Sequence, residues 1–156
     1  MVGLDIEVKN EYDSYLKKIF QSLNLKMYDW EIFMDETICC ENGKLTNGLF
    51  KPHLHNKNFL NGNDFDKLIS KNSYYMIFVD IHAYPRNAKR TNIRKYQDFV
   101  ESECQIILMC VDVSFIEIYC KDKEILNVIY ENCKEHKFDS VKFVSMEQAK
   151  NRGVRA

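Results

Sequence analysis

Residues 75–82 read YMIFVDIH and residues 105–112 read QIILMCVD, and these two runs decide the fold. The first is apolar on both faces until Asp80, and the second is apolar throughout Ile106–Val111. A strand without a polar face is usually central in a sheet and covered on both sides. The segment between the two runs, Ile93–Ser102, has the apolar spacing of a helix. We therefore expect two neighbouring parallel strands joined by a crossover helix.

The segments after these runs predict a hairpin and a second crossover. A tight turn at Val113–Ser114 leads into a strand at Phe115–Cys120, antiparallel to the preceding one. A helix capped by Asp122 then leads to a last strand at Val141–Ser145. The expected fold class is α+β. It has a single mixed sheet of about six or seven strands, three main helices, right-handed crossover units and one central hairpin.

The N-terminal half predicts shorter elements. They are a half-buried strand at Gly3–Val8, a helix from Asn10 to Leu23, short strands at Trp30–Met34 and Glu36–Cys40, and a helix from Asn63 to Lys71. The segment Leu45–Gly62 has the composition of a loop and is expected to be mobile.

The length of 156 residues fits one domain, which we expect at residues 1–145. The remaining residues, 146–156, contain few apolar anchors and are expected to form a weakly anchored C-terminal tail. The net charge of −1, from 22 basic and 23 acidic residues, argues against a large electrostatic surface for nucleic acid or anionic membrane.

The six cysteines are expected to be free thiols. Met1 is followed by Val-Gly-Leu-Asp, which is not the start of a secretory signal. Three of the cysteines fall on apolar strands or helix faces, and Cys104 is the one expected to be exposed. No run of 18 apolar residues is present, and we expect a cytoplasmic protein without a membrane partner.

Several stretches resemble a known family. They are Asn10-Glu11-Tyr12, Tyr74–Pro85, Ser102–Gln105 continuing through Asp112, and Ile118–Lys123. Together they resemble an uncharacterised family of small single-domain proteins from Bacillus, Clostridium and related bacteria, catalogued as a domain of unknown function. The resemblance covers most of the chain except the Leu45–Gly62 loop. It implies a bacterial cytoplasmic protein, and it implies no activity and no catalytic residue.

One candidate ligand site lies at the ends of the two central strands. Asp80 and His82 are two residues apart and share a face, Asp112 closes the next strand, and Tyr84 and Arg86 follow the first. With parallel strands, these side chains would meet at the carboxyl edge of the sheet, where ligands usually bind. Two carboxylates and a histidine can bind a divalent metal or act in acid–base catalysis. Alternatively, the two aspartates cap neighbouring loops.

Two other groups of residues carry less specific chemistry. His53 and His55 could hold zinc, but a structural site needs about four ligands, and the adjacent Cys39 and Cys40 point opposite ways. The basic cluster from Arg86 to Lys95 could bind phosphate, or could be a solvated loop. There is no phosphate-binding loop and no nucleophile motif, so we predict no cofactor, no metal and no assigned catalytic residue.

Three functions remain open at this point. The first is a non-catalytic protein-interaction module that binds a protein partner, such as an inhibitor or immunity-type factor. The second is a small-ligand binder or metal-assisted enzyme that uses Asp80, His82 and Asp112. The third is weak nucleic-acid binding through Arg86–Lys95.

Overall fold

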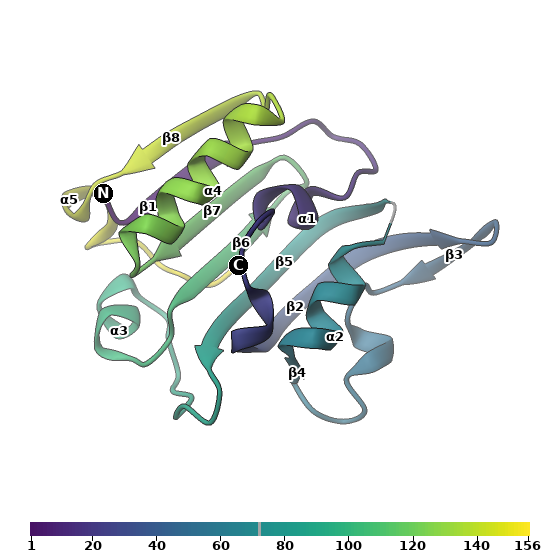
Figure 1. Ribbon diagram of the computed structural model, residues 1–156, viewed down its shortest axis with the longest axis horizontal. Helices are drawn as coiled ribbons and strands as arrows, with labels where there is room; N and C mark the ends of the chain where they lie inside the picture. Colours follow the sequence, from purple (N-terminus) through teal and green to yellow (C-terminus); the bar gives the residue numbers. More distant parts are fainter. Residues whose placement is uncertain (72) are drawn as a thin grey trace.

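A computed structural model of the protein describes residues 1–71 and 73–156, and one twisted sheet runs through it (Figure 1). The strands are β1 (Gly3–Glu7), β2 (Tyr28–Glu41), β3 (Lys44–Asn47), β4 (Phe59–Asn61), β5 (Tyr74–Pro85), β6 (Ile106–Val111), β7 (Phe115–Cys120) and β8 (Ser140–Val144). The helices are α1 (Tyr15–Ile19), α2 (Gly62–Ile69), α3 (Tyr96–Glu101), α4 (Lys123–Glu135) and α5 (Met146–Ala149), with 3-10 turns η1 (Leu25–Met27) and η2 (Lys51–His53).

The predicted α+β class is confirmed, but the count and the type of sheet differ from the prediction. In the described part of the chain the sheet has eight strands in the order β3-β2-β5-β6-β7-β1-β8, with β4 also paired to β2. All paired strands are antiparallel, so the expected mixed sheet is wrong. Five helices are present among these residues instead of three. The central hairpin is confirmed as β6–β7, with Ile106 opposite Cys120.

The first predicted crossover is wrong, because β5 and β6 are adjacent and antiparallel, with Val79 opposite Cys110. Both strands are apolar on both faces because both faces are covered, and this pattern is independent of strand direction. The connection between them contains only the short helix α3, which begins at Tyr96 after Lys95. The second crossover is partly right. Helix α4 links β7 to β8, and these two strands run in the same direction on either side of β1.

Two elements of the N-terminal half also differ from the prediction. The helix expected from Asn10 spans only Tyr15–Ile19, and the two short strands expected around Asp35 are one long strand, β2, with register shifts beside Phe33 and after Glu36. Helix α2 is capped by the side chain of Asn61 instead of Asn63.

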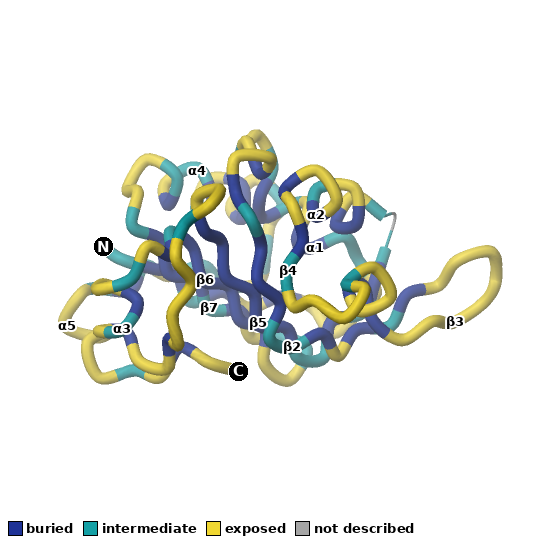
Figure 2. Tube along the Cα trace, turned by 90° about the horizontal axis from the view of Figure 1, so that it is seen from below, coloured by how far each residue is buried: buried dark blue, intermediate teal, exposed yellow. Residues whose placement is uncertain are grey.

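The two faces of the sheet carry different covers (Figures 1 and 2). Helices α1, α2 and α4 cover the first face, over a core that includes the single tryptophan, Trp30. Helices α3 and α5 and the C-terminal segment lie on the other side, which we call the second face, over a smaller core around Tyr96 and Tyr119. The strands β5 and β6 therefore contribute side chains to both cores.

The Leu45–Gly62 segment is fixed to the sheet by a buried carboxylate. Asp35, only 1% exposed, accepts hydrogen bonds from the backbone N–H groups of Phe50 and Lys51 (2.8 Å each) and of Leu49 (3.1 Å). Leu49 and Phe50 are themselves fully buried. A segment with the composition of a loop is thus attached to β2, the strand that precedes it, and it contains most of β3 and all of β4.

The C-terminal segment makes contacts along the second face. Ala149 and Val154 are fully buried, and the Val154 N–H donates to the carbonyl of Arg94 at 2.8 Å. Arg152 pairs with Asp5 through both terminal nitrogens, at 2.8 and 3.1 Å. Across the described ranges, residues 1–71 and 73–156, none of the helices has the length and apolar character needed to cross a membrane.

Candidate functional site

Strand β5 brings Asp80, His82 and Tyr84 to the second face, because alternate residues of a strand share a face. Asp80 is 1% exposed and His82 is fully buried. Ionisable side chains are rarely buried this completely unless they are paired. This part of β5 is therefore a candidate functional site.

Asp80 is the centre of a buried polar cluster. Its Oδ2 accepts hydrogen bonds from Arg155 Nε at 2.9 Å and from the Ala156 N–H at 3.0 Å. Its Oδ1 lies 3.1 Å from His82 Nε2, but their relative orientation is not that of a hydrogen bond. Within the described residues, Asp80 Oδ1 and both ring nitrogens of His82 therefore have no hydrogen-bond partner. Such unpartnered buried atoms are unusual in a folded protein.

Phe33 closes the cluster from the neighbouring strand β2. Its ring centre lies 4.5 Å from that of His82, at an angle of 56°. The Arg155 guanidinium carbon sits 3.7 Å from the same ring centre, which is a cation–π contact. The Arg155 guanidinium thus contacts the Asp80 carboxylate through one edge and the Phe33 ring through one face.

A second arrangement of the same kind lies next to the first. Arg90 stacks on Phe59 at 4.3 Å and places Nη1 3.5 Å from Glu31 Oε2. Glu31 lies opposite His82 across the β2–β5 pairing and is 7% exposed, and its Oε1 has no hydrogen-bond partner in the described part of the chain. Burial raises the pKa of the Glu31 carboxyl, while the nearby Arg90 and His82 act to lower it.

The structure brings together only some of the predicted site residues. Tyr84 shares the face of Asp80, and its hydroxyl lies 3.4 Å from the carbonyl oxygen of Thr91. Burial raises the pKa of Tyr84 to about 12, so it is a neutral phenol at physiological pH. Arg86 is exposed and donates to the carbonyl of Lys26 at 2.7 Å.

The expectation that Asp112 joins the site is wrong. Because β6 runs antiparallel to β5, the end of β6 returns to the beginning of β5, and the Val113 N–H donates to the carbonyl of Ile77 at 3.2 Å. Asp112 is an exposed turn residue with φ of +52°, away from His82. Its place fits the alternative reading of a turn-forming aspartate.

Neither of the other two candidate groups forms a converging site. The basic cluster divides, since Arg90 points to Glu31 whereas the N–H groups of Arg94 and Lys95 donate to Asp98. Among residues 1–71 and 73–156, there is no group of three His, Cys, Asp or Glu side chains placed to hold a metal ion.

Part of the second face, over β6, β7, β1 and β8, carries exposed side chains. Val111, Phe115, Glu7 and Ser140 form one row across these strands, and Phe115 is 51% exposed. The next row contains Glu117, Asp5 and Lys142. A hollow of about 370 Å³ lies over β7, β1 and β8, and we call it the open groove. The side chains of these two rows that line it, together with Arg152, are Glu7, Phe115, Ser140, Asp5, Glu117 and Lys142, and Val111 lies beside it.

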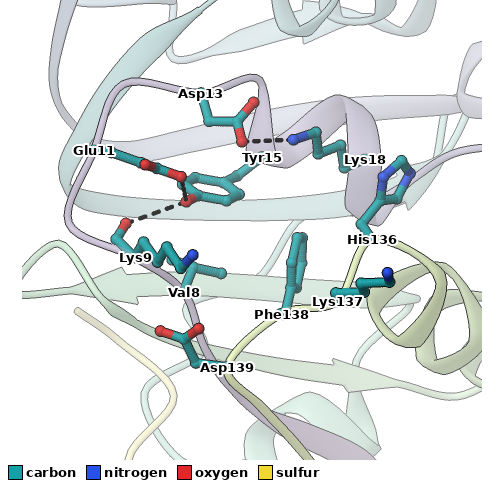
Figure 3. A pocket seen from close by; sticks show the side chains of 10 residues that line it. All are labelled: Val8, Lys9, Glu11, Asp13, Tyr15, Lys18, His136, Lys137, Phe138 and Asp139. Atoms are coloured by element: carbon teal, nitrogen blue, oxygen red, sulfur yellow. Dashed lines mark hydrogen bonds and ion pairs between the residues drawn. The ribbon is translucent and has the colours of Figure 1, made fainter.

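A smaller hollow of about 120 Å³ lies between the start of α1 and the loop after α4 (Figure 3). Two contacts tie its polar groups together, since Lys18 binds Asp13 and the Tyr15 hydroxyl lies 3.1 Å from Glu11 Oε1. His136 Nε2 lies 2.6 Å from Gln21 Oε1. The last contact joins the segment after α1 to the end of α4.

Sequence reasoning missed Phe33, Glu31 and Arg155 as parts of the polar cluster. Glu31 and Phe33 are two apart on a strand that pairs with β5, and an expected β2–β5 pairing would have indicated them. Arg155 had no local signal, since it reaches Asp80 from 75 residues away.

Comparison with known proteins places the chain among bacterial proteins. The family described as "Protein of unknown function (DUF2691)" matches residues 1–154. The chain is 30% identical over 145 residues to "Uncharacterized protein YncE" from Bacillus subtilis (strain 168), covering 93% of this chain and 92% of that protein. No solved structure matches it.

Proposed function

Because the chain belongs to the DUF2691 family, whose members have no established function, we propose a role from its own surface: a non-catalytic protein-interaction module. The partner protein binds in the open groove. The observation that carries this proposal is the row formed by Val111, Phe115 and Glu7, in which a large apolar ring stands exposed beside an acid. Neighbouring exposed apolar groups with polar groups at their rim are typical of protein-binding surfaces.

The charges of the open groove favour a particular partner. Arg152 already pairs with Asp5 and Glu117. Glu7 makes no ion pair within the described residues and stands opposite Phe115. The surface therefore suits a segment that presents an apolar side chain next to a basic one. A second copy of the chain fits less well, because a symmetric pair would bring the Glu7 carboxylates of both copies into one interface without a basic partner.

The proposal can be tested by photo-crosslinking in the native host. Benzoylphenylalanine at position 115 should give one discrete heavier product, and the same group at position 100 should not. Val100 is a matched control, since it is a 45% exposed apolar residue on α3, outside the groove. Glu7→Lys should abolish the product at position 115.

Three results would count against the proposal. They are a product of the same mass from both positions, a product that survives Glu7→Lys, and no product at all. A product with twice the mass of the chain would identify a second copy as the occupant, in contradiction to the charge argument.

A further inference from the structure

The contacts of Arg155 have the features of ligand recognition. Its Nε donates a charge-assisted hydrogen bond to a carboxylate that is 1% exposed, and its guanidinium lies flat enough on Phe33 to bring the carbon within 3.7 Å of the ring centre. Charge-assisted hydrogen bonds are about twice as strong as neutral ones, and the cation–π contact adds a further attraction. Arg155 itself is only partly covered, with 32% of its side chain exposed.

The site has more bonding capacity than Arg155 uses. Asp80 Oδ1 and both nitrogens of His82 are buried without a hydrogen-bond partner in the described structure. A carboxylate can accept two parallel N–H bonds from one guanidinium, but here only Nε is engaged. The Arg155 guanidinium therefore leaves the buried Asp80 Oδ1 without a donor, which is unfavourable.

The segment that carries Arg155 is anchored one residue earlier. Val154 is fully buried and hydrogen-bonded to Arg94, whereas Arg155 and Ala156 are exposed at the surface. A hollow of about 300 Å³, lined by Arg94, Gly153 and Arg155, adjoins the site. Residues 155 and 156 can thus leave Asp80 without unpacking the core, and the hollow gives access to it.

The bond from Ala156 defines the ligand more closely. The N–H that follows the arginine donates to the same Oδ2 that binds the guanidinium. An arginine within a peptide or one with an amide cap supplies this N–H, whereas free arginine ends in a carboxylate that Asp80 would repel.

We propose that Asp80 and Phe33 form a binding site for an arginine followed by a peptide N–H, filled by Arg155 and Ala156 of the same chain and open to another arginyl segment when these leave. The proposal is independent of the open groove, which lies over other strands. It gives the buried Asp80, and the unpartnered polar atoms of Asp80 and His82, a role in the recognition of a peptide.

The test uses the full chain with Arg155→Ala, which empties the site. N-acetyl-arginine amide should raise the melting temperature of this variant in proportion to the logarithm of its concentration above the dissociation constant, by on the order of 2–4 °C at about five times that constant. N-acetyl-arginine with a free carboxylate should raise it much less, and N-acetyl-lysine amide should have no effect. The wild-type protein, with its site filled, should respond only at higher concentrations.

Two further variants decide the outcome. Asp80→Asn in the Arg155→Ala background should abolish the rise in melting temperature, and Phe33→Leu in that background should weaken it. If Arg155→Ala does not fold, Arg155→Gln, which keeps most of the side-chain length without its charge, serves as the emptied protein. No rise with the arginine amide, an equal rise with the lysine amide, or an equal rise after Asp80→Asn would overturn the proposal. Equal responses to the amide and the free acid would show that free arginine is the ligand class instead.

Discussion

The cysteine thiols differ in their accessibility to solvent, even between neighbours in the sequence. Cys40 is exposed, and the other five cysteines are buried as free thiols. The expectation that Cys104 is the exposed one is therefore wrong, because the tail and α3 cover it. Cys39 and Cys40 are adjacent on β2, and alternation sends one side chain inward and the other outward.

We expect one thiol per native chain to react rapidly with an aromatic disulfide reagent. Burial raises the pKa of Cys104, Cys110 and Cys133 to about 12, which leaves about one such thiol in 10⁴ ionised at pH 8. Cys40→Ser should remove the fast phase, and Cys104→Ser should leave it unchanged. In denaturant all six thiols of the wild type should react. A fast phase that survives Cys40→Ser would contradict this assignment.

The pH dependence of stability should carry the signature of Glu31. Burial raises the pKa of this carboxyl above 4.5, so the folded protein holds the proton more tightly than the unfolded chain does. The stability gained this way is present below pH 4.5 and is lost as the pH rises through the raised value. The glutamine of Glu31→Gln is neutral at every pH, so this variant should lose none of that stability as the pH rises.

The free energy of unfolding of Glu31→Gln, minus that of the wild type, should therefore increase from pH 4 to pH 7 in urea titrations. Arg90→Gln removes a cation that lowers the pKa of Glu31. In a protein that retains Glu31, this substitution should therefore increase the stability lost between pH 4 and pH 7. A difference that is flat or decreases over this range would show that the Arg90 pairing outweighs burial.

At the scale of elements, local patterns predicted strands better than they predicted the first helix. The strand at Phe115–Cys120 was predicted within its observed bounds, and α4 begins after Asp122 as expected, because alternation and capping are local signals. The helix expected from Asn10 begins only at Tyr15, because Asp13 pairs with the start of β5. The Asp13 backbone pairs with that of Tyr74 in both directions, at 3.1 and 3.2 Å, and a residue bound to a strand in this way cannot continue a helix.

The packing of α2 against η1 depends on a glycine that the sequence pattern does not mark. A Cβ at Gly62 would lie 2.4 Å from the carbonyl oxygen of Leu25 and 2.5 Å from the Cα of Lys26. Both are backbone atoms and cannot rotate away. Gly62→Ala should therefore push α2 off η1 and lower the free energy of unfolding by about 2–3 kcal/mol, measured by urea denaturation.

Gly43 provides the control for this change. It lies in the turn between β2 and β3 with φ of +77°, and a Cβ there would meet nothing within 4 Å. Gly43→Ala should cost about 1 kcal/mol from backbone strain alone. If Gly62→Ala costs no more than Gly43→Ala, the close approach of α2 to η1 does not limit stability.

At the scale of the whole molecule, strand direction was the information that sequence could not supply. Strands that are apolar on both faces indicate cover on both sides, and a helix plus a docked tail can provide it for antiparallel strands as well as for parallel ones. The shared face of Asp80 and His82 was predictable, because the two residues lie two apart on one strand. The contact of Arg155 with Asp80 and the position of Asp112 outside the site both depend on how distant segments pack together, which no local pattern encodes.

The two cores share their central strands, and this predicts that they unfold together. Val79 and Ile81 of β5 face the first core and Tyr84 faces the second, so losing one core exposes the back of the strands that hold the other. We expect one cooperative transition, as in most single domains of this size. Trp30, fully buried in the first core, reports on that side by fluorescence.

Trp30→Phe combined with Tyr96→Trp moves the reporter to the second core. In each protein, the midpoint of the fluorescence transition in urea should equal that of the far-ultraviolet circular dichroism transition of the same protein. This comparison removes any effect of the substitutions on stability itself. If the reporter at position 96 changes at lower urea than the dichroism, then the cover of α3 and the tail detaches first. The second face would then unfold as a separate unit, and Asp80 and His82 would be uncovered while the first core remains folded.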